Sequence, residues 1–239
     1  MREDGVKHSL ILGLCLVAGL ALLGYLLGSS AIRFKAFERT VSVKGLSEKE
    51  LPADIAIWPI QFTVADNDLT TLYNRLEDDT RRILGFLSAN GFETSEITVS
   101  TPAIFDKLAQ QYGSGERMEI RYTANQTVTV YSQKIDAVRT TMNKLVELGK
   151  GGIVFSGGNY ENKTEFLFTR LNDVKPEMIE EATRNAREVA DKFARDSDSR
   201  VGEIRVARQG LFTINDRDVN TPQIKIVRVV STIDFQLSE

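Results

Sequence analysis

The chain has almost no cysteine or histidine: its 239 residues include one cysteine, Cys15, and one histidine, His8. Both lie near the N-terminus, so the chain from residue 16 onward contains neither. Residues 16–239 therefore cannot form disulfides, Cys/His zinc sites, or Cys-His and Ser-His-Asp nucleophilic groups among themselves. Because a domain without cysteine tolerates oxidising and reducing surroundings alike, the scarcity of cysteine does not fix the compartment.

A dense basic segment is also missing. Lys and Arg total 30 against 33 Asp and Glu, which gives a formal net charge of -3 at pH 7. Nucleic-acid binding depends largely on clustered basic side chains that neutralise phosphates, so the composition disfavours a nucleic-acid partner. The hydrophobic content of 42% is ordinary for a globular protein and is enough for a sizeable core.

One long apolar run lies near the N-terminus. Residues 10–28, LILGLCLVAGLALLGYLLG, carry no charged side chain, and a helix of this length covers about 30 Å, the thickness of bilayer hydrocarbon. The sequence therefore predicts a short tail at residues 1–8, a transmembrane helix at residues 9–31 and a connector at residues 32–39. A cleaved signal peptide is the alternative, because Ser29-Ser30-Ala31 offers small residues for a peptidase. The flanking charges do not decide the orientation.

The stretch LPADIAIWPIQFTV, residues 51–64, alternates as a β-strand does. Its alternation places five apolar side chains on one face: Ala56, Trp58, Ile60, Phe62 and Val64. Pro59 falls on the opposite face and removes one backbone donor. Because proline cannot donate to a ladder, Pro59 predicts an edge strand or a bulge.

Three amphipathic helices are predicted from apolar spacings of three and four residues, at about residues 68–91, 134–148 and 174–197. Their predicted buried faces are Leu69, Leu72, Leu76, Ile83 and Leu87 in the first, Val138, Met142 and Leu145 in the second, and Ile179, Ala182, Ala186, Val189 and Phe193 in the third. Further strands are predicted at residues 96–105, 120–132, 153–160, 161–170, 202–210 and 224–237, with a polar loop at residues 213–223.

The order of these elements is ββα, ββα, β, α, ββ. Antiparallel strands that are connected through helices predict an α+β fold in which three helices pack on one sheet. The repeated strand-helix-strand units also suggest two pseudo-repeated halves.

Three segments together resemble the SIMPL-domain family, which includes periplasmic immunogenic proteins and oxidative-stress defence proteins. They are TVSVKGLSEKELPADIAIWPIQF, NGFETSEITVSTPAIF followed by RYTANQTVTV, and EEATRNAREVADKFARDSDSRVGEIRVARQG. The resemblance covers residues 39–239 and implies a SIMPL-like domain at residues 40–239. The family's usual Gly-Tyr-x-Ala is Arg121-Tyr122-Thr123-Ala124 here, and its Pro-x-Tyr is not evident, so the resemblance leaves that hairpin open.

The resemblance implies an exported domain, and with it a cytoplasmic tail at residues 1–8 and a single-pass protein of the bacterial cytoplasmic membrane. It also implies self-association, because family members form ring-like homo-oligomers, and it supplies no catalytic residues. The expected protein is a non-enzymatic homo-oligomer in the bilayer with an envelope or oxidative-stress protective role. A periplasmic module that sequesters a lipid, peptide or other envelope ligand is the alternative, and an enzyme using carboxylates and Ser/Thr is the third hypothesis.

We assign no catalytic, cofactor-binding or metal-binding residue from the sequence. The glycine run GKGGIVFSGG, residues 149–158, lacks the GxxxxGK[ST] spacing of a phosphate cradle and follows a helix, which favours a helix cap and a bulge. The adjacent acids Asp78-Asp79 and Glu180-Glu181 diverge by ~100° on a helix, which favours a solvated face over a shared proton or metal. Trp58 is predicted in the core instead of stacked on a ligand, and Asp54 is predicted as a turn-capping acid instead of a general base.

Overall fold

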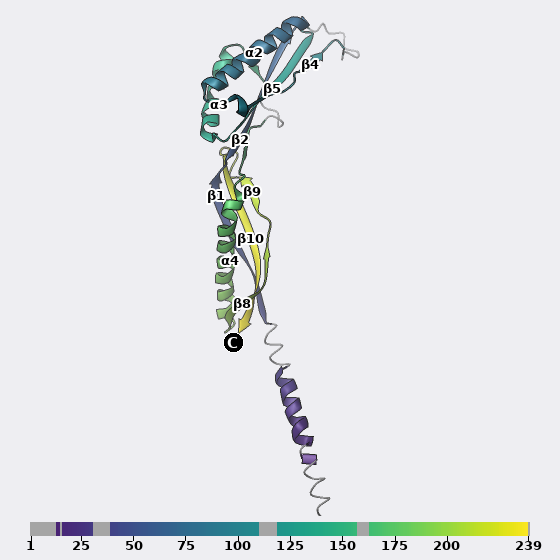
Figure 1. Ribbon diagram of the computed structural model, residues 1–239, viewed down its shortest axis with the longest axis vertical. Coiled ribbons are helices and arrows are strands. Elements are labelled where there is room, and N and C mark those ends of the chain that lie inside the picture. The colour runs from purple at the N-terminus through teal and green to yellow at the C-terminus, as the bar shows by residue number, and fades with distance from the viewer. Residues whose placement is uncertain (1–12, 15, 31–38, 110–118, 157–162, 239) are drawn as a thin grey trace, which may run out of the picture. The chain divides into compact units, whose positions relative to one another are not determined.

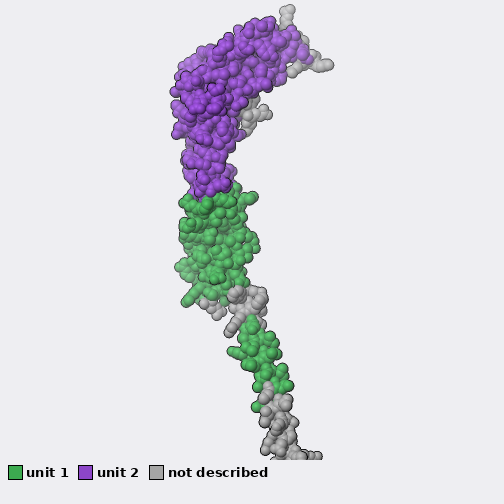
Figure 2. All heavy atoms as spheres, viewed as in Figure 1, with its two compact units in different colours: residues 1–48, 175–212, 228–239 green, residues 49–174, 213–227 purple. Residues whose placement is uncertain are grey.

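The computed structural model describes residues 13–14, 16–30, 39–109, 119–156 and 163–238. They form an α+β fold of antiparallel sheets and helices, as predicted (Figure 1). The chain divides into two compact units, shown in different colours in Figure 2. Unit 1 comprises residues 1–48, 175–212 and 228–239, and unit 2 comprises residues 49–174 and 213–227. The strands form two separate sheets, so the prediction of a single sheet under three helices is wrong.

Unit 2 is built on two long strands, β2 (Ile55–Asp66) and β5 (Tyr122–Ser132), which pair antiparallel from Ala56↔Ser132 to Asp66↔Tyr122. Four short strands complete this six-stranded sheet. They are β3 (Ile97–Val99) and β4 (Ala103–Asp106) on the β5 side, and β6 (Val154–Phe155) and β7 (Glu165–Leu167) on the β2 side. The predicted strand at residues 96–105 is therefore two strands, interrupted around Pro102, and a 3-10 turn η1 (Thr94–Glu96) precedes it.

The core of unit 2 lies between this sheet and the helices α2 (Leu69–Ala89) and α3 (Ile135–Lys150). All five side chains of the predicted β2 face are buried, which confirms the alternation. The predicted face of α2 is also buried at Leu72, Leu76, Ile83 and Leu87, whereas Leu69 at its first turn is 41% exposed. In α3, Val138 is buried as predicted, and Met142 and Leu145 are partly buried against the same core.

Pro59 lies in a central strand, so the prediction of an edge strand is wrong. At its position in β2, however, the missing N–H costs no hydrogen bond to a described neighbouring strand. The Ser156 backbone N–H donates to Gln61 O at 3.0 Å, so Gln61 directs its backbone groups toward β6, and Pro59, two residues earlier, faces the same side. On that side β7 ends opposite Ile57 and β6 begins opposite Phe62, so no described strand pairs with Pro59. The proline occupies a gap in an otherwise paired strand.

The four-stranded sheet has the order β1-β10-β8, with β1 (Thr40–Pro52), β10 (Ile224–Ser238) and β8 (Arg200–Gln209). A fourth strand, β9 (Thr213–Asp216), also pairs with β10, although this segment is predicted as a loop. Its sequence, TIND, carries no apolar alternation, and pairing with the long β10 makes it a strand. The helix α4 (Leu171–Asp196) covers the face of β1 and β10 (Figure 1).

α4 approaches β1 through alanines. Its buried residues, Met178, Ala182, Ala186, Ala190 and Ala194, recur every four positions. The predicted stripe is right at Ala182 and Ala186 but wrong at Phe193, which is 56% exposed. A Cβ at Gly45 would lie 1.8 Å from the Ala182 carbonyl oxygen, so the two backbones nearly touch at this point. Large side chains are therefore excluded from the centre of this interface.

The N-terminal apolar segment is helical at residues 13–14 and 16–30. No helix within the described residues is both long and apolar enough to cross a bilayer, so the predicted transmembrane helix is not found among them. Residues 9–12, 15 and 31 of that predicted helix lie outside the described residues.

Candidate functional site

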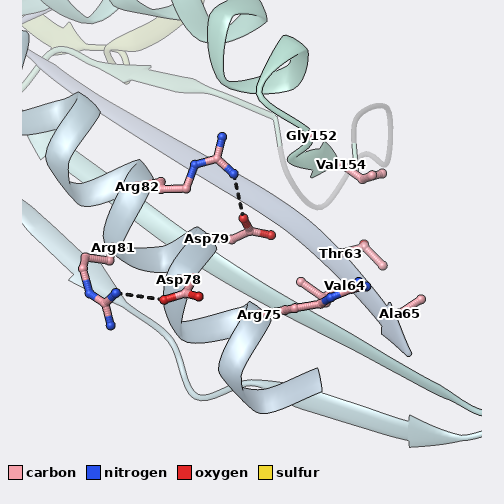
Figure 3. Close-up of a pocket in the computed structure, with 10 residues that line it drawn as sticks. All are labelled: Thr63, Val64, Ala65, Arg75, Asp78, Asp79, Arg81, Arg82, Gly152 and Val154. Carbon is pink, nitrogen blue, oxygen red and sulfur yellow. Dashed lines mark hydrogen bonds and ion pairs between the residues drawn. The ribbon is translucent and has the colours of Figure 1, made fainter. Parts of the chain in front are cut away.

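A groove of about 780 Å³ lies in unit 2 between α2, β2 and the turn that follows α3 (Figure 3). Because β6 pairs with β2 only at Phe62 and Thr63, the last residues of β2 remain open beside it. The lining consists of Thr63, Val64 and Ala65 from β2, Arg75, Asp78, Asp79, Arg81 and Arg82 from α2, and Gly152 and Val154 after α3. Val154 is 63% exposed and gives the groove an apolar rim.

The arginines of this groove are all paired. Arg82 Nη1 lies 3.2 Å from Asp79 Oδ1 (Figure 3). Arg82 Nη2 also donates to Gly151 O at 2.7 Å. Arg81 pairs with Asp78 at 2.8 Å and Arg75 with Asp66 at 3.2 Å. Since each guanidinium already faces a carboxylate, the groove presents alternating, largely neutralised charges instead of a positive pocket for an anion.

Asp78 and Asp79 occupy different surroundings. The Asp78 side chain is 65% exposed, as predicted for a solvated face, whereas that of Asp79 is only 19% exposed and lies against the groove. Burial raises the pKa of Asp79 above its usual value, although the Arg82 guanidinium opposes the shift. The prediction of a solvated face is therefore wrong for Asp79, because successive helix residues point ~100° apart. In the sequence, Arg82, one helical turn after Asp79, was the residue that could have indicated a partner for Asp79.

The polar groups on the floor of the groove are also occupied. Thr63 Oγ1 donates to Asn125 Oδ1 at 2.7 Å and shares a hydrogen bond with Ser156 Oγ. Among the described residues, no group of three or more His, Cys, Asp or Glu side chains is placed to hold a metal ion.

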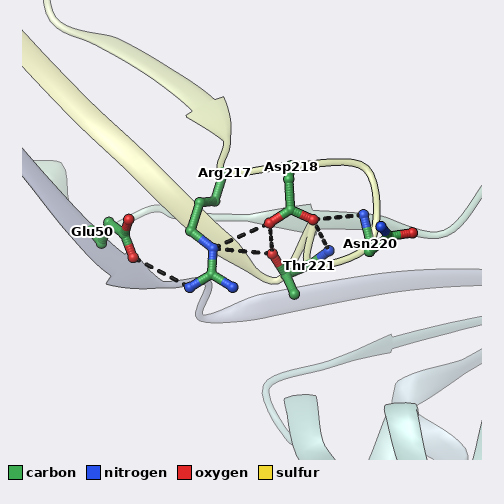
Figure 4. A network of polar contacts seen from close by, with 5 residues as sticks. All are labelled: Glu50, Arg217, Asp218, Asn220 and Thr221. Carbon is green, nitrogen blue, oxygen red and sulfur yellow. Dashed lines mark hydrogen bonds and ion pairs between the residues drawn. The ribbon is translucent and has the colours of Figure 1, made fainter.

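A second polar cluster fixes the β9–β10 turn (Figure 4). Arg217 bridges Glu50, at 3.3 Å, and Asp218, at 3.2 Å. Asp218 accepts backbone N–H groups of Asn220 and Thr221 at 2.8 Å each, and the Thr221 hydroxyl with these groups lowers the pKa of Asp218 to about 2. The turn is thereby ordered while Val219 at its tip is 85% exposed. These contacts hold the loop between β9 and β10.

Asp54 caps backbone groups, as predicted, but its partners are remote in sequence. Its carboxylate accepts from the Thr169 N–H at 3.0 Å, the Thr169 hydroxyl at 3.1 Å and the Arg170 N–H at 3.2 Å. It thus joins the β1–β2 turn to the segment before α4. Only the tertiary fold brings these residues together, so the sequence identifies the acid but not its partners.

The structure also places the other residues that the sequence analysis considered. Trp58 is 4% exposed in the core, as predicted. Gly151 and Gly152 end α3, with Gly152 at φ 96°, which confirms the helix cap; Gly157 and Gly158 lie outside the described residues. Glu181 accepts a hydrogen bond from buried Ser47 Oγ at 2.8 Å and so is not purely solvated.

The family follows from a comparison with known families. Residues 41–227 match SIMPL, described as a protein of unknown function (DUF541). The chain belongs to the SIMPL family. The match begins in β1 and ends in β10, so it takes in both sheets, and it confirms the resemblance seen in the sequence. A comparison with curated proteins finds no match.

Replacing Asp54 by alanine is expected to lower the stability of this SIMPL chain by about 2 kcal/mol, because several donors of Thr169 and Arg170 lose a charged acceptor at once. The Asp54 side chain is 15% exposed. Asp136→Ala is the matched control, because the Asp136 side chain is 97% exposed and its pair with Arg139 is 3.8 Å long. Urea unfolding of both variants measures the difference; equal stabilities would contradict the capping role.

The lowered pKa of Glu96 in the folded protein predicts that stability depends on pH. Burial alone would raise its pKa, but the Glu93 backbone N–H, Lys134 and Ser132 outweigh that effect and lower the pKa to about 2. Because the folded pKa lies below the unfolded value, the stabilisation is present above about pH 4.3 and is lost as the pH falls toward 2. Glu96→Gln is therefore expected to lose stability at pH 7 and to approach the parent protein near pH 2. Thermal melting across this range tests it; a constant difference at all pH values would contradict it.

Proposed function

We propose that this SIMPL chain is a membrane-anchored, non-enzymatic, extracytoplasmic protein that self-assembles into a ring- or cage-like homo-oligomer with an envelope or oxidative-stress protective role. The observation that carries the proposal is the β1 edge of the four-stranded sheet. β1 is a terminal strand of 13 residues, and no described strand pairs with its outer edge. A long edge strand is a template for another chain, and closed symmetric assembly covers such edges.

The N-terminal segment supports the anchor. Residues 10–28 carry no charge, and leucines on different sides of the helical part are exposed: Leu20 at 61%, Leu22 at 61% and Leu23 at 56%. Apolar side chains exposed on all sides of a helix favour an apolar environment. Anchoring also concentrates copies in one plane, which strengthens weak contacts between them.

The chemistry of the described residues supports a non-enzymatic role. The groove of unit 2 has paired charges and engaged hydroxyls, and the chain from residue 16 onward contains no histidine or cysteine. Turnover of a substrate that disappears on changing a single acidic residue would contradict this part of the proposal. The protective role rests on the family resemblance; cells with and without the gene should differ in survival under peroxide, and equal survival would contradict it.

The mass of the detergent-solubilised, full-length chain tests self-assembly. Light scattering is expected to give a multiple of 26.7 kDa, after subtraction of detergent, across a wide concentration range. A mass of one chain at every concentration would contradict the proposal.

A binding module is the second candidate, favoured by the open groove of about 780 Å³ along α2. Its apolar rim and alternating charges suit a peptide or a lipid with a zwitterionic headgroup. Vesicles of phosphatidylethanolamine and an unstructured peptide are suitable probes. A rise in melting temperature that Arg82→Ala abolishes would support the module, and unchanged melting with both probes would exclude these two ligand classes.

A further inference from the structure

The six-stranded sheet of unit 2 has a second face, opposite the one on which α2 and α3 pack. Both helices contact the face that carries Trp58 and Val130. Because successive side chains of a strand point to opposite faces, the odd-numbered residues of β2 and β5 lie on the other side of the sheet. We call the ten residues placed there by the β2–β5 register the open face: Ile57↔Tyr131, Pro59↔Thr129, Gln61↔Thr127, Thr63↔Asn125 and Ala65↔Thr123.

The open face carries no charged side chain, although 26% of the chain is charged. Its centre consists of short polar side chains around the pairs Gln61↔Thr127 and Thr63↔Asn125. Tyr131 is exposed and the other members are partly exposed. A charge comes beside the open face on β7, where Glu165 lies opposite Ile57. The composition of the open face therefore disfavours a ligand that needs a partner of opposite charge.

Two exposed aromatic side chains mark the ends of the open face. Tyr131, at one end, is 51% exposed. At the other end, Phe105 of β4 lies directly opposite Thr123 and hence on the same side of the sheet, and it is 44% exposed. Tyr131 and Thr123 are eight residues apart along β5, which corresponds to about 27 Å. A polar strip thus has an aromatic ring at each end.

The side chains between the two rings offer hydrogen-bond donors and acceptors without charge. Each threonine hydroxyl can donate one hydrogen bond and accept two. Asn125 Oδ1 accepts from Thr63 Oγ1 at 2.7 Å, which fixes the orientation of the Asn125 amide and leaves the two donors of Nδ2 on its other side. On β3, Thr98 lies opposite Thr129 and extends the polar surface by one strand.

These properties match an uncharged oligosaccharide. Sugar hydroxyl groups donate and accept hydrogen bonds as the threonine and amide side chains do, and the C–H face of a sugar ring packs against an aromatic ring. Placing a charged ligand here would cost free energy, because its charge would lose water without gaining a charged partner. A protein partner fits less well, since interface cores are enriched in aromatic residues, methionine and arginine, and residues 59–63 and 125–129 of the open face include none of these.

We propose that the open face binds an extended, uncharged oligosaccharide. Sugar rings stack on Tyr131 and Phe105, and sugar hydroxyl groups form hydrogen bonds with the polar side chains between them. The inference goes beyond the proposed self-assembly, because the open face lies within unit 2 and a single chain can present it.

Titration calorimetry of the full-length chain, solubilised in a detergent without a sugar headgroup, tests the class of ligand. The probes are the hexamers of β-linked N-acetylglucosamine and of β-linked glucose, with the anionic hexamer of galacturonate as the control. At least one neutral hexamer is expected to bind, and the anionic hexamer is expected to bind more weakly or not at all. Failure of both neutral hexamers to bind, or equally tight binding of the anionic one, would overturn the proposal.

Variants of the open face locate the binding. Tyr131→Ala and Phe105→Ala are each expected to raise the dissociation constant of the neutral hexamer by about two- to tenfold, the range for one aromatic contact. Thr127→Lys places a charge at the centre and is expected to raise it by about tenfold or more. Tyr73→Ala is the matched control, because Tyr73 is also 44% exposed but belongs to α2, on the other face of the sheet. Its dissociation constant is expected to stay unchanged.

Thermal melting of each variant shows whether the chain still folds. Folded aromatic variants that bind the hexamer as tightly as the parent chain would contradict the proposed site. If Thr127→Lys changes the particle mass in light scattering but leaves hexamer binding intact, the open face is a contact between copies of the chain and the proposal is wrong.

Discussion

Gly45→Ala is expected to destabilise unit 1 by about 3 kcal/mol or more. The added Cβ would lie 1.8 Å from Ala182 O and 2.6 Å from Ala186 N. Both atoms belong to the backbone of α4, so no side-chain rotation relieves the clash, and the helix has to move away from β1. Overpacking of a core costs about 1–3 kcal/mol when side chains can adjust, and more when they cannot. Urea unfolding followed by circular dichroism at a helix wavelength measures the loss.

Gly85→Ala is the control for this prediction. Gly85 lies inside α2, and a Cβ there would meet nothing within 4 Å. Alanine is expected to stabilise an exposed helix position by about 0.5–1 kcal/mol over glycine. If Gly45→Ala were as well tolerated as Gly85→Ala, the close approach of α4 to β1 would be wrong.

Phe62→Ala is expected to destabilise unit 2 by about 3–5 kcal/mol, the range for removing a buried phenylalanine ring. Phe62 is fully buried at the centre of β2, where it pairs with β5 on one side and with β6 on the other. Trp58, the only tryptophan, lies in the same core. Its fluorescence during urea unfolding therefore reports the stability of this unit directly.

Phe105→Ala is the matched control, because Phe105 belongs to the same sheet but is 44% exposed. Its loss is expected to cost less than about 1 kcal/mol, in proportion to the smaller area removed from water. Similar midpoints for the two variants would contradict the assignment of the core to the α2 and α3 face of the sheet.

Local patterns in the sequence were sufficient for most of the secondary structure. The alternation around Trp58 predicts the buried face of β2, because successive side chains of a strand point to opposite faces and the apolar residues mark the buried one. The leucine spacing of α2 works in the same way. The stripe of α4 was predicted less well because small residues give a weak signal: Ala190 and Ala194 define the contact, while the larger Phe193 is exposed.

Tertiary arrangement accounts for the features that the sequence did not reveal. Pro59 correctly indicates a missing hydrogen bond, but whether the gap lies at an edge or between two short strands depends on β6 and β7, which are about a hundred residues away. Two sheets were predicted as one because period-two patterns do not say which strands pair. Asp79 lies against the groove, and Asp54 contacts Thr169, only in the packed fold.

The central claim is that this SIMPL chain works through assembly of anchored copies, and images of the full-length protein extracted from membranes test it most directly. Electron microscopy of single particles is expected to show closed, symmetric particles of several chains, with the N-terminal segments gathered in one detergent belt. Isolated single chains without a detergent belt, at concentrations where the protein is intact and folded, would contradict the claim.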